Sequence, residues 1–156
     1  MDLKTLKINN PLYIGQVAPL VQMFFKRIEK NPSIKGVSYE SLTTYFTYVI
    51  QFGGDLAEFH VVMDDTTPVA FAVWRVLGPP HFGISFCEYI YSSTKSNEPM
   101  ELLCDTFVKY GKKHHTPYYS FVTINDAVSR RLKIISKQFG FQLEDTGIRN
   151  FIGRRI

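Results

Sequence analysis

The chain has 156 residues, 45% of them hydrophobic and 21% charged, which is enough to bury one core without disulfides or metals. No apolar run approaches the ~20 residues that cross a bilayer, and the N-terminus lacks the apolar stretch of a signal peptide. The net charge is +4, and the expected location is the cytoplasm, where Cys87 and Cys104 would be free, buried thiols.

The N-terminal third predicts one strand followed by two helices. Leu3–Ile8 alternates apolar and polar residues, as a half-buried strand does. Val17–Ile28 carries apolar residues at helical spacing and ends in Glu-Lys-Asn-Pro, where proline disfavours further helix. The second helix runs from about Ser38, a plausible N-cap, to Phe52, and Gly53-Gly54 ends it.

The middle of the chain predicts three consecutive strands. Glu58–Met63 and Pro68–Leu77 flank an Asp-Asp-Thr-Thr hairpin loop, and both are rich in β-branched and aromatic residues. Phe82–Tyr91 follows after a Gly-Pro-Pro turn. In an extended strand, every second residue of Phe82–Tyr91 would share one face, which groups Glu88 with Phe82, Ile84, Phe86 and Ile90.

The last part predicts two helices, Glu98–Lys113 and Ala127–Gln138, and three strands, Tyr118–Ile124, Phe141–Leu143 and Gly147–Ile152. The inward face of the first helix would hold Met100, Leu103, Phe107 and Tyr110. The whole order, β-α-α-β-β-β-α-β-α-β-β, predicts an α/β fold. A single domain over residues 1–156 would have a mixed sheet of about six to seven strands, flanked by four helices on both faces.

The positive charge gathers at the end of the chain. Residues 1–125 carry 11 basic and 11 acidic side chains, whereas residues 126–156 carry seven basic and three acidic ones. Such an end could contact an acidic protein, a phosphate or a nucleic acid, or be a solvated helix face with a charged tail. The candidate interaction residues are Arg130, Arg131, Arg149, Phe151, Arg154 and Arg155.

Glu88 is the candidate acid–base residue. A carboxylate among aromatic side chains could accept a proton from an amine. The alternative is an ion pair with Arg75 on the neighbouring strand. The histidines, His60, His81, His114 and His115, do not have metal-ligand spacing on one element, so no metal site is predicted.

The stretch from Tyr118 to Phe141 forms a strand, an Asn-containing turn and a helix that ends in Gly140-Phe141. Together with the element order, it resembles the GNAT superfamily of acyl-CoA-dependent N-acetyltransferases. The resemblance implies that Phe82–Tyr91 and Tyr118–Ile124 run parallel and splay apart at one end. It also implies that a central strand supplies a base such as Glu88.

The resemblance further implies a loop of the pattern Gln/Arg-x-x-Gly-x-Gly/Ala, whose amides hold the coenzyme A diphosphate at a helix N-terminus. Here Thr94, Asn97 and Pro99 occupy the positions of the pattern, and no glycine lies between Ser93 and Leu103. Lys95, Ser96 and Asn97 remain as cofactor-binding candidates, with Lys95 as a compensating charge. Glu98 and Glu101 would repel phosphate.

The family's tyrosine acid, four residues before the glycine, is replaced by Ser136, a far weaker acid. The main functional prediction is therefore a non-catalytic structural or protein-interaction component without a cofactor. Degenerate members of this kind resemble virion-associated proteins of tailed phages. We expect a protein partner or a second copy to dock near the C-terminal strand, taken as an edge strand, with nucleic acid as the competing partner. The alternative function is a divergent N-acyltransferase that uses acetyl-CoA, with Glu88 as base.

Overall fold

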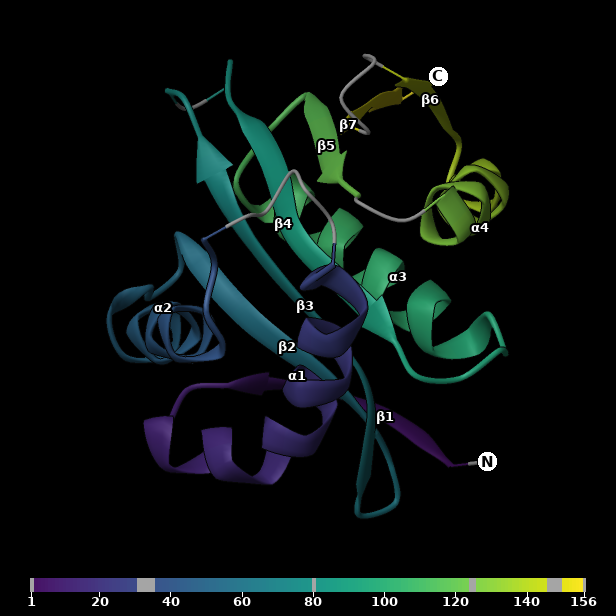
Figure 1. The fold of residues 1–156 in the computed structure, drawn as a ribbon. Helices are drawn as coiled ribbons and strands as arrows, with labels where there is room; N and C mark the ends of the chain where they lie inside the picture. Colours follow the sequence, from purple (N-terminus) through teal and green to yellow (C-terminus); the bar gives the residue numbers. More distant parts are fainter. Residues whose placement is uncertain (1, 31–35, 80, 124–125, 146–149, 156) are drawn as a thin grey trace.

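The computed structural model describes residues 2–30, 36–79, 81–123, 126–145 and 150–155, with the last two strands described by their backbone. Within these ranges, seven strands form one sheet in the order β1-β2-β3-β4-β5-β7-β6 (Figure 1). The strands are β1 Leu3–Ile8, β2 Ala57–Asp64, β3 Thr67–Leu77, β4 Ile84–Ser92, β5 Tyr118–Val122, β6 Phe141–Asp145 and β7 Asn150–Arg155. The pairing of β4 with β5 is parallel and the other pairings are antiparallel, so the predicted mixed sheet is confirmed.

Helices cover both faces of the sheet, as predicted. Those described are α1 Ile14–Ile28, α2 Tyr39–Phe52, α3 Glu98–Lys113 and α4 Asp126–Gln138, with a short 3-10 turn, η1 Pro11–Tyr13, before α1. The helices α1 and α2 pack on one face, and α3 and α4 on the other. Ser38 caps α2 through a reciprocal capping box with Ser41, which fixes where this helix begins.

Each face has its own buried core. On the α1/α2 face, Phe24, Phe46, Phe59 and Phe71 pack edge to face or stacked. On the α3/α4 face, Trp74 is fully buried against α3. The inward face predicted for α3 is confirmed, because its four members are all buried: Met100, Leu103, Phe107 and Tyr110.

The strand β4 begins two residues later than predicted. Phe82 lies in the preceding turn and is 81% exposed. The turn depends on Gly83, where an added Cβ would lie 2.7 Å from the carbonyl oxygen of Leu77. At the other end of α4, Gly140 has φ +74°, so the predicted glycine stop is confirmed.

A β-bulge lies at Glu88. Val73 of β3 faces Tyr89 of β4, and Trp74 faces Cys87, so Glu88 is an extra residue without a partner on β3. The bulge interrupts the alternation of the strand. Glu88 therefore lies on the α1/α2 side with Tyr89, whereas Ile90 belongs to the core of the α3/α4 side. The prediction that Glu88 and Ile90 share one face is wrong for this reason.

Cys87 and Cys104 are both free and buried, as predicted. Burial raises the pKa of both thiols, that of Cys104 to about 12, so neither is a thiolate at neutral pH. Among the helices described, none has the length and apolar character needed to span a membrane.

Candidate functional site

The strands β4 and β5 separate at one end. Their parallel register runs from Ile84 opposite Tyr118 to Cys87 opposite Phe121. Beyond Cys87, β4 continues to Ser92 and leads through a loop into α3, whereas β5 ends at Val122 (Figure 1). The predicted parallel pairing and the splayed end are thus both present. The bulge at Glu88 lies where the two strands part.

A cavity of about 300 Å³ opens at this splay. Along the sheet, β4 contributes Phe86 and residues 88–92, and the chain at the end of β5 contributes Val122 and Thr123. The helices complete the wall, and their contributions are Phe24, Arg27 and Ile28 from α1, and Ala127, Val128 and Arg131 from α4. The lining is mostly apolar, with Glu88, Arg27 and Arg131 as its charged members.

Glu88 is held by two partners from different elements. Arg75 of β3 contacts its Oε1 at 2.9 Å through Nε, and the Tyr45 hydroxyl of α2 donates to the same oxygen at 2.5 Å. The predicted alternative, an ion pair with Arg75, is therefore present. The second oxygen, Oε2, takes part in neither contact, and the side chain lines the cavity with 15% of its surface exposed. Glu88 thus combines an ion pair with a place in the cavity wall.

Tyr45 and Tyr91 are site residues that the sequence patterns missed. Burial raises the pKa of Tyr45, and its hydrogen bond to Glu88 raises it further, so this phenol stays protonated as a donor. Tyr91 lines the cavity and is buried, and its hydroxyl has no hydrogen-bond partner among the described residues. Such an orphaned hydroxyl is costly in a protein interior, by about 1–3 kcal/mol, unless a ligand or water satisfies it.

The loop between β4 and α3 is tied to α4. Arg131 donates through Nε to Asn97 Oδ1 at 3.0 Å and through Nη2 to the carbonyl oxygen of Ser96 at 2.7 Å. Ser96 and Asn97, two cofactor-binding candidates, thus contact Arg131, a candidate interaction residue. Lys95, the third cofactor-binding candidate, is exposed. The spacing of the sequence could not show this contact, because 34 residues separate Asn97 from Arg131.

The acidic residues of α3 lie elsewhere. Glu98 and Glu101 line a separate hollow with Asp105, Asp2 and Leu3. Neither lines the cavity at the splay. The expectation that they repel a phosphate at the cofactor loop stays a prediction. Pro99 does occupy the first turn of α3, so one amide donor is absent there.

Ser136 is not a substitute for the tyrosine acid. It is buried, donates to the carbonyl oxygen of Lys133 at 3.0 Å, and borders a small apolar hollow between α3, α4 and β5. The cavity at the splay does not include it.

The basic chain end is only partly described. Arg130 is exposed on α4, Arg149 lies outside the described residues, and Phe151, Arg154 and Arg155 are described by their backbone in β7. This strand is no edge, because it pairs with β5 on one side and β6 on the other. The premise of an exposed C-terminal edge strand is therefore wrong, since β6 is the edge. A protein or nucleic-acid partner stays a prediction.

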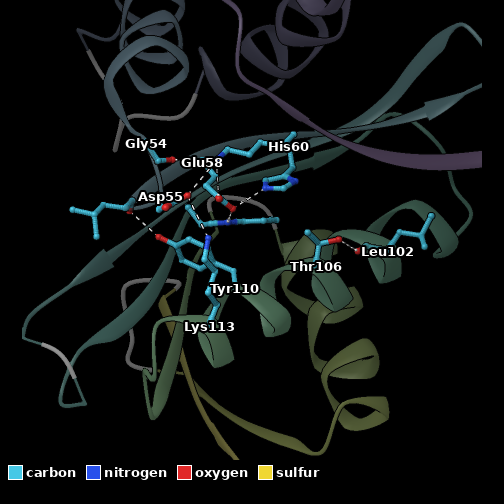
Figure 2. A network of polar contacts seen from close by, with 11 residues as sticks. Gly54, Asp55, Glu58, His60, Leu102, Thr106, Tyr110 and Lys113 are labelled. Carbon is cyan, nitrogen blue, oxygen red and sulfur yellow. Dashed lines mark hydrogen bonds and ion pairs between the residues drawn. The ribbon is translucent and has the colours of Figure 1, made fainter.

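A second carboxylate, Glu58, is buried on the opposite face of the sheet, and no sequence pattern pointed to it. Figure 2 shows Glu58 among His60, Asp55 and Tyr110. His60 Nε2 contacts Glu58 Oε1 at 2.9 Å, Lys7 Nζ contacts Oε2 at 3.1 Å, and Trp74 Nε1 donates to Oε1 at 3.3 Å. Burial alone would raise the pKa of Glu58, but the hydrogen bonds from His60 and Lys7, with their charges, lower it to about 2.

No protein-family model matches this chain, and no curated protein matches it in sequence. Solved structures do match over nearly the whole chain. A probable acetyltransferase from Staphylococcus epidermidis is 14% identical with a TM-score of 0.66, covering 98% of this chain and 96% of its own. A predicted acetyltransferase with acetyl-CoA from Clostridium acetobutylicum is 16% identical, with a TM-score of 0.66 and 93% of both chains covered. The PaiA N-acetyltransferase from Thermoplasma acidophilum, in complex with coenzyme A, is 15% identical, with a TM-score of 0.65 and 99% of both chains covered.

At these identities the similarity shows the fold, which is that of GNAT-type acetyltransferases. The main functional prediction, a non-catalytic structural component such as a phage virion protein, is wrong against these findings. The three structures above are a probable acetyltransferase, a predicted acetyltransferase and an N-acetyltransferase, and the last two hold acetyl-CoA or coenzyme A. The comparisons favour the alternative prediction of an acyl-CoA-dependent enzyme, and they give no support to the expected absence of a cofactor.

Proposed function

We propose that this chain is a divergent GNAT-type N-acyltransferase that moves an acetyl group from acetyl-CoA to an amine. The observation that carries the proposal is the cavity at the splay between β4 and β5, which brings Glu88, Tyr91 and Arg131 to one hollow. The fold shared with acetyltransferases supports the same reaction class. The fold would not suffice without the cavity, because one fold serves many functions.

The residues of the cavity fit acetyl-CoA in three respects. The apolar lining suits the pantetheine arm. The β4 backbone beyond Cys87 lies past its register with β5, so it can hydrogen-bond to the amides of an extended chain, as a sheet edge does. A polar ligand in the cavity would give the unpaired hydroxyl of Tyr91 a hydrogen-bond partner.

Bound acetyl-CoA would supply a thioester carbonyl for attack by the amine. Glu88 is the residue to hold the amine and take its proton, through the oxygen that neither Arg75 nor Tyr45 engages. These two partners fix the carboxylate in place, which supports orientation of the acceptor. Ser136 lies outside the cavity. The proton that Glu88 takes from the amine is therefore the one to be returned to the departing sulfur.

Calorimetric titration of the purified chain with acetyl-CoA tests the proposal. We expect saturable binding with Kd below about 1 mM, in the ordinary range for enzyme substrates. A thiol-release assay with acetyl-CoA and a panel of amines would then identify the acceptor. Absence of binding at millimolar acetyl-CoA, together with no thiol release from any amine, would overturn the proposal.

A further inference from the structure

The helix α4 carries two adjacent arginines in different environments. Arg130 is exposed. Arg131 is partly buried, lines the cavity, and is bonded to Ser96 and Asn97 in the loop before α3. The pair therefore offers one arginine fixed at the candidate site and one matched arginine outside it.

The two hydrogen bonds to the loop fix the orientation of the Arg131 guanidinium and leave some of its N–H donors unused. A guanidinium has five N–H donors in a planar fork, and the contacts to Asn97 and Ser96 use two of them. Within the described residues, no carboxylate pairs with Arg131, and arginine stays charged even where burial lowers its pKa. A fixed cation with remaining donors is suited to bidentate binding of a phosphate.

The loop's own cation, Lys95, is exposed and does not line the cavity, and several polar groups of the loop are already engaged. The Ser92 and Thr94 hydroxyls bond each other at 3.2 Å, and the Glu98 amide is directed to the Ser96 hydroxyl at 3.3 Å. Pro99 has no amide to donate, and no glycine allows close approach of the backbone between Ser93 and Leu103. A side-chain cation at this end of β4 would compensate for the missing glycines and for the amide that Pro99 lacks.

The length of β4 supports the arrangement. From Glu88 to Ser92 the strand spans about 13 Å, at ~3.3 Å per residue. This separation places the candidate base and the Arg131-bonded loop at opposite ends of one extended segment. An acyl group near Glu88 and a diphosphate near Arg131 would be joined by the pantetheine arm along the strand. The buried, unpartnered hydroxyl of Tyr91 independently points to a polar ligand in the same cavity.

We propose that Arg131 binds the diphosphate of the acyl-CoA and replaces the backbone amides of the missing glycine loop. The inference rests on the proposed function, since it concerns the same ligand. It differs from a purely structural role of Arg131, in which the guanidinium only fastens α4 to the loop.

The experiment compares acetyl-CoA with S-acetyl-pantetheine, which lacks the diphosphate, against the intact chain, Arg131→Ala and Arg130→Ala. Calorimetry measures acetyl-CoA binding, and saturation-transfer NMR measures the weaker ligand. We expect Arg131→Ala to weaken acetyl-CoA binding about tenfold to a hundredfold, as loss of a charged hydrogen-bonded contact does, and to leave S-acetyl-pantetheine binding unchanged. Arg130→Ala should change neither by more than about twofold, because an exposed charge contributes little.

Added salt gives a second readout. Acetyl-CoA binding by the intact chain should weaken with sodium chloride more steeply than binding by Arg131→Ala, because one ionic contact has been removed. Arg131→Lys keeps the charge and loses the fork, so an intermediate affinity is expected. This variant decides the matter if Arg131→Ala does not fold.

Two results overturn the inference while leaving the proposed function intact. One is acetyl-CoA binding by Arg131→Ala that equals binding by the intact chain. The other is an equal loss for acetyl-CoA and S-acetyl-pantetheine, which would mean that Arg131 acts by holding the loop. If the intact chain binds neither ligand, the proposed function itself fails.

Discussion

Two glutamates on opposite faces of the sheet, the buried Glu58 and the partly buried Glu88, differ in how many of their carboxylate oxygens have partners. Glu58 engages both oxygens, with Lys7 on one and His60 and Trp74 on the other. Glu88 receives Arg75 and Tyr45 on a single oxygen and borders a cavity of about 300 Å³. A carboxylate satisfied on both oxygens stabilises the fold, whereas one with an oxygen beside a cavity is available for chemistry.

The largest effect expected from this comparison is on stability. Glu58→Ala should lower the free energy of unfolding by about 2–4 kcal/mol, because His60 and Trp74 would lose their buried hydrogen-bond acceptor and Lys7 its ion-pair partner. Urea denaturation followed by the fluorescence of Trp74, the only tryptophan, measures it. A loss below about 1 kcal/mol would contradict a structural role of Glu58.

Lowering the pH should remove the contribution of Glu58 to the free energy of unfolding. The pKa of Glu58 in the folded chain is about 2, below its ordinary value of 4.5. Its stabilisation is therefore fully present above about pH 4.5 and is lost as the pH falls through about 2. The stability difference between the intact chain and Glu58→Gln should shrink by up to about 3 kcal/mol over this range, at ~1.4 kcal/mol per pKa unit. Urea titrations at several pH values test this, and a constant difference would rule it out.

On the opposite face, Glu88→Gln should reduce turnover about 100-fold, at the lower end of what general acid–base catalysis contributes. Acetyl-CoA affinity should change much less, because the amide keeps the shape of the side chain. Steady-state kinetics and calorimetry separate the two effects. Glu98→Gln is the matched control, since Glu98 lines another hollow. Equal turnover in both variants would remove Glu88 from the reaction.

The smallest effect is expected at Tyr45. Tyr45→Phe removes one hydrogen bond to Glu88 and leaves the ion pair with Arg75, so stability should fall by about 1 kcal/mol or less. Turnover should fall less than in Glu88→Gln, because the carboxylate itself remains. Tyr48→Phe, on the same helix and exposed, provides the control. A Tyr45→Phe variant as slow as Glu88→Gln would mean that the phenol, and not the carboxylate, is essential.

The sequence by itself determined the element order and most of the boundaries. Local patterns suffice for this, because alternation, helical spacing and capping residues act over a few positions, as at Ser38 and Gly140. The parallel pairing of β4 and β5 also followed, since a helix connects them. The bulge at Glu88 did not follow, because an extra residue in a strand is defined only against its partner.

The tertiary structure alone decided the site. Three features join residues far apart in the chain: the contact of Arg131 with Asn97, the contacts of Lys7 and Trp74 with Glu58, and the cavity that Glu88 shares with Arg131. The missing glycines in the loop after β4 could be read directly from the sequence, and they led to a non-catalytic prediction. The arginine that can compensate for them lies on another helix, because folding, and not spacing along the chain, brings a charge to an anion site.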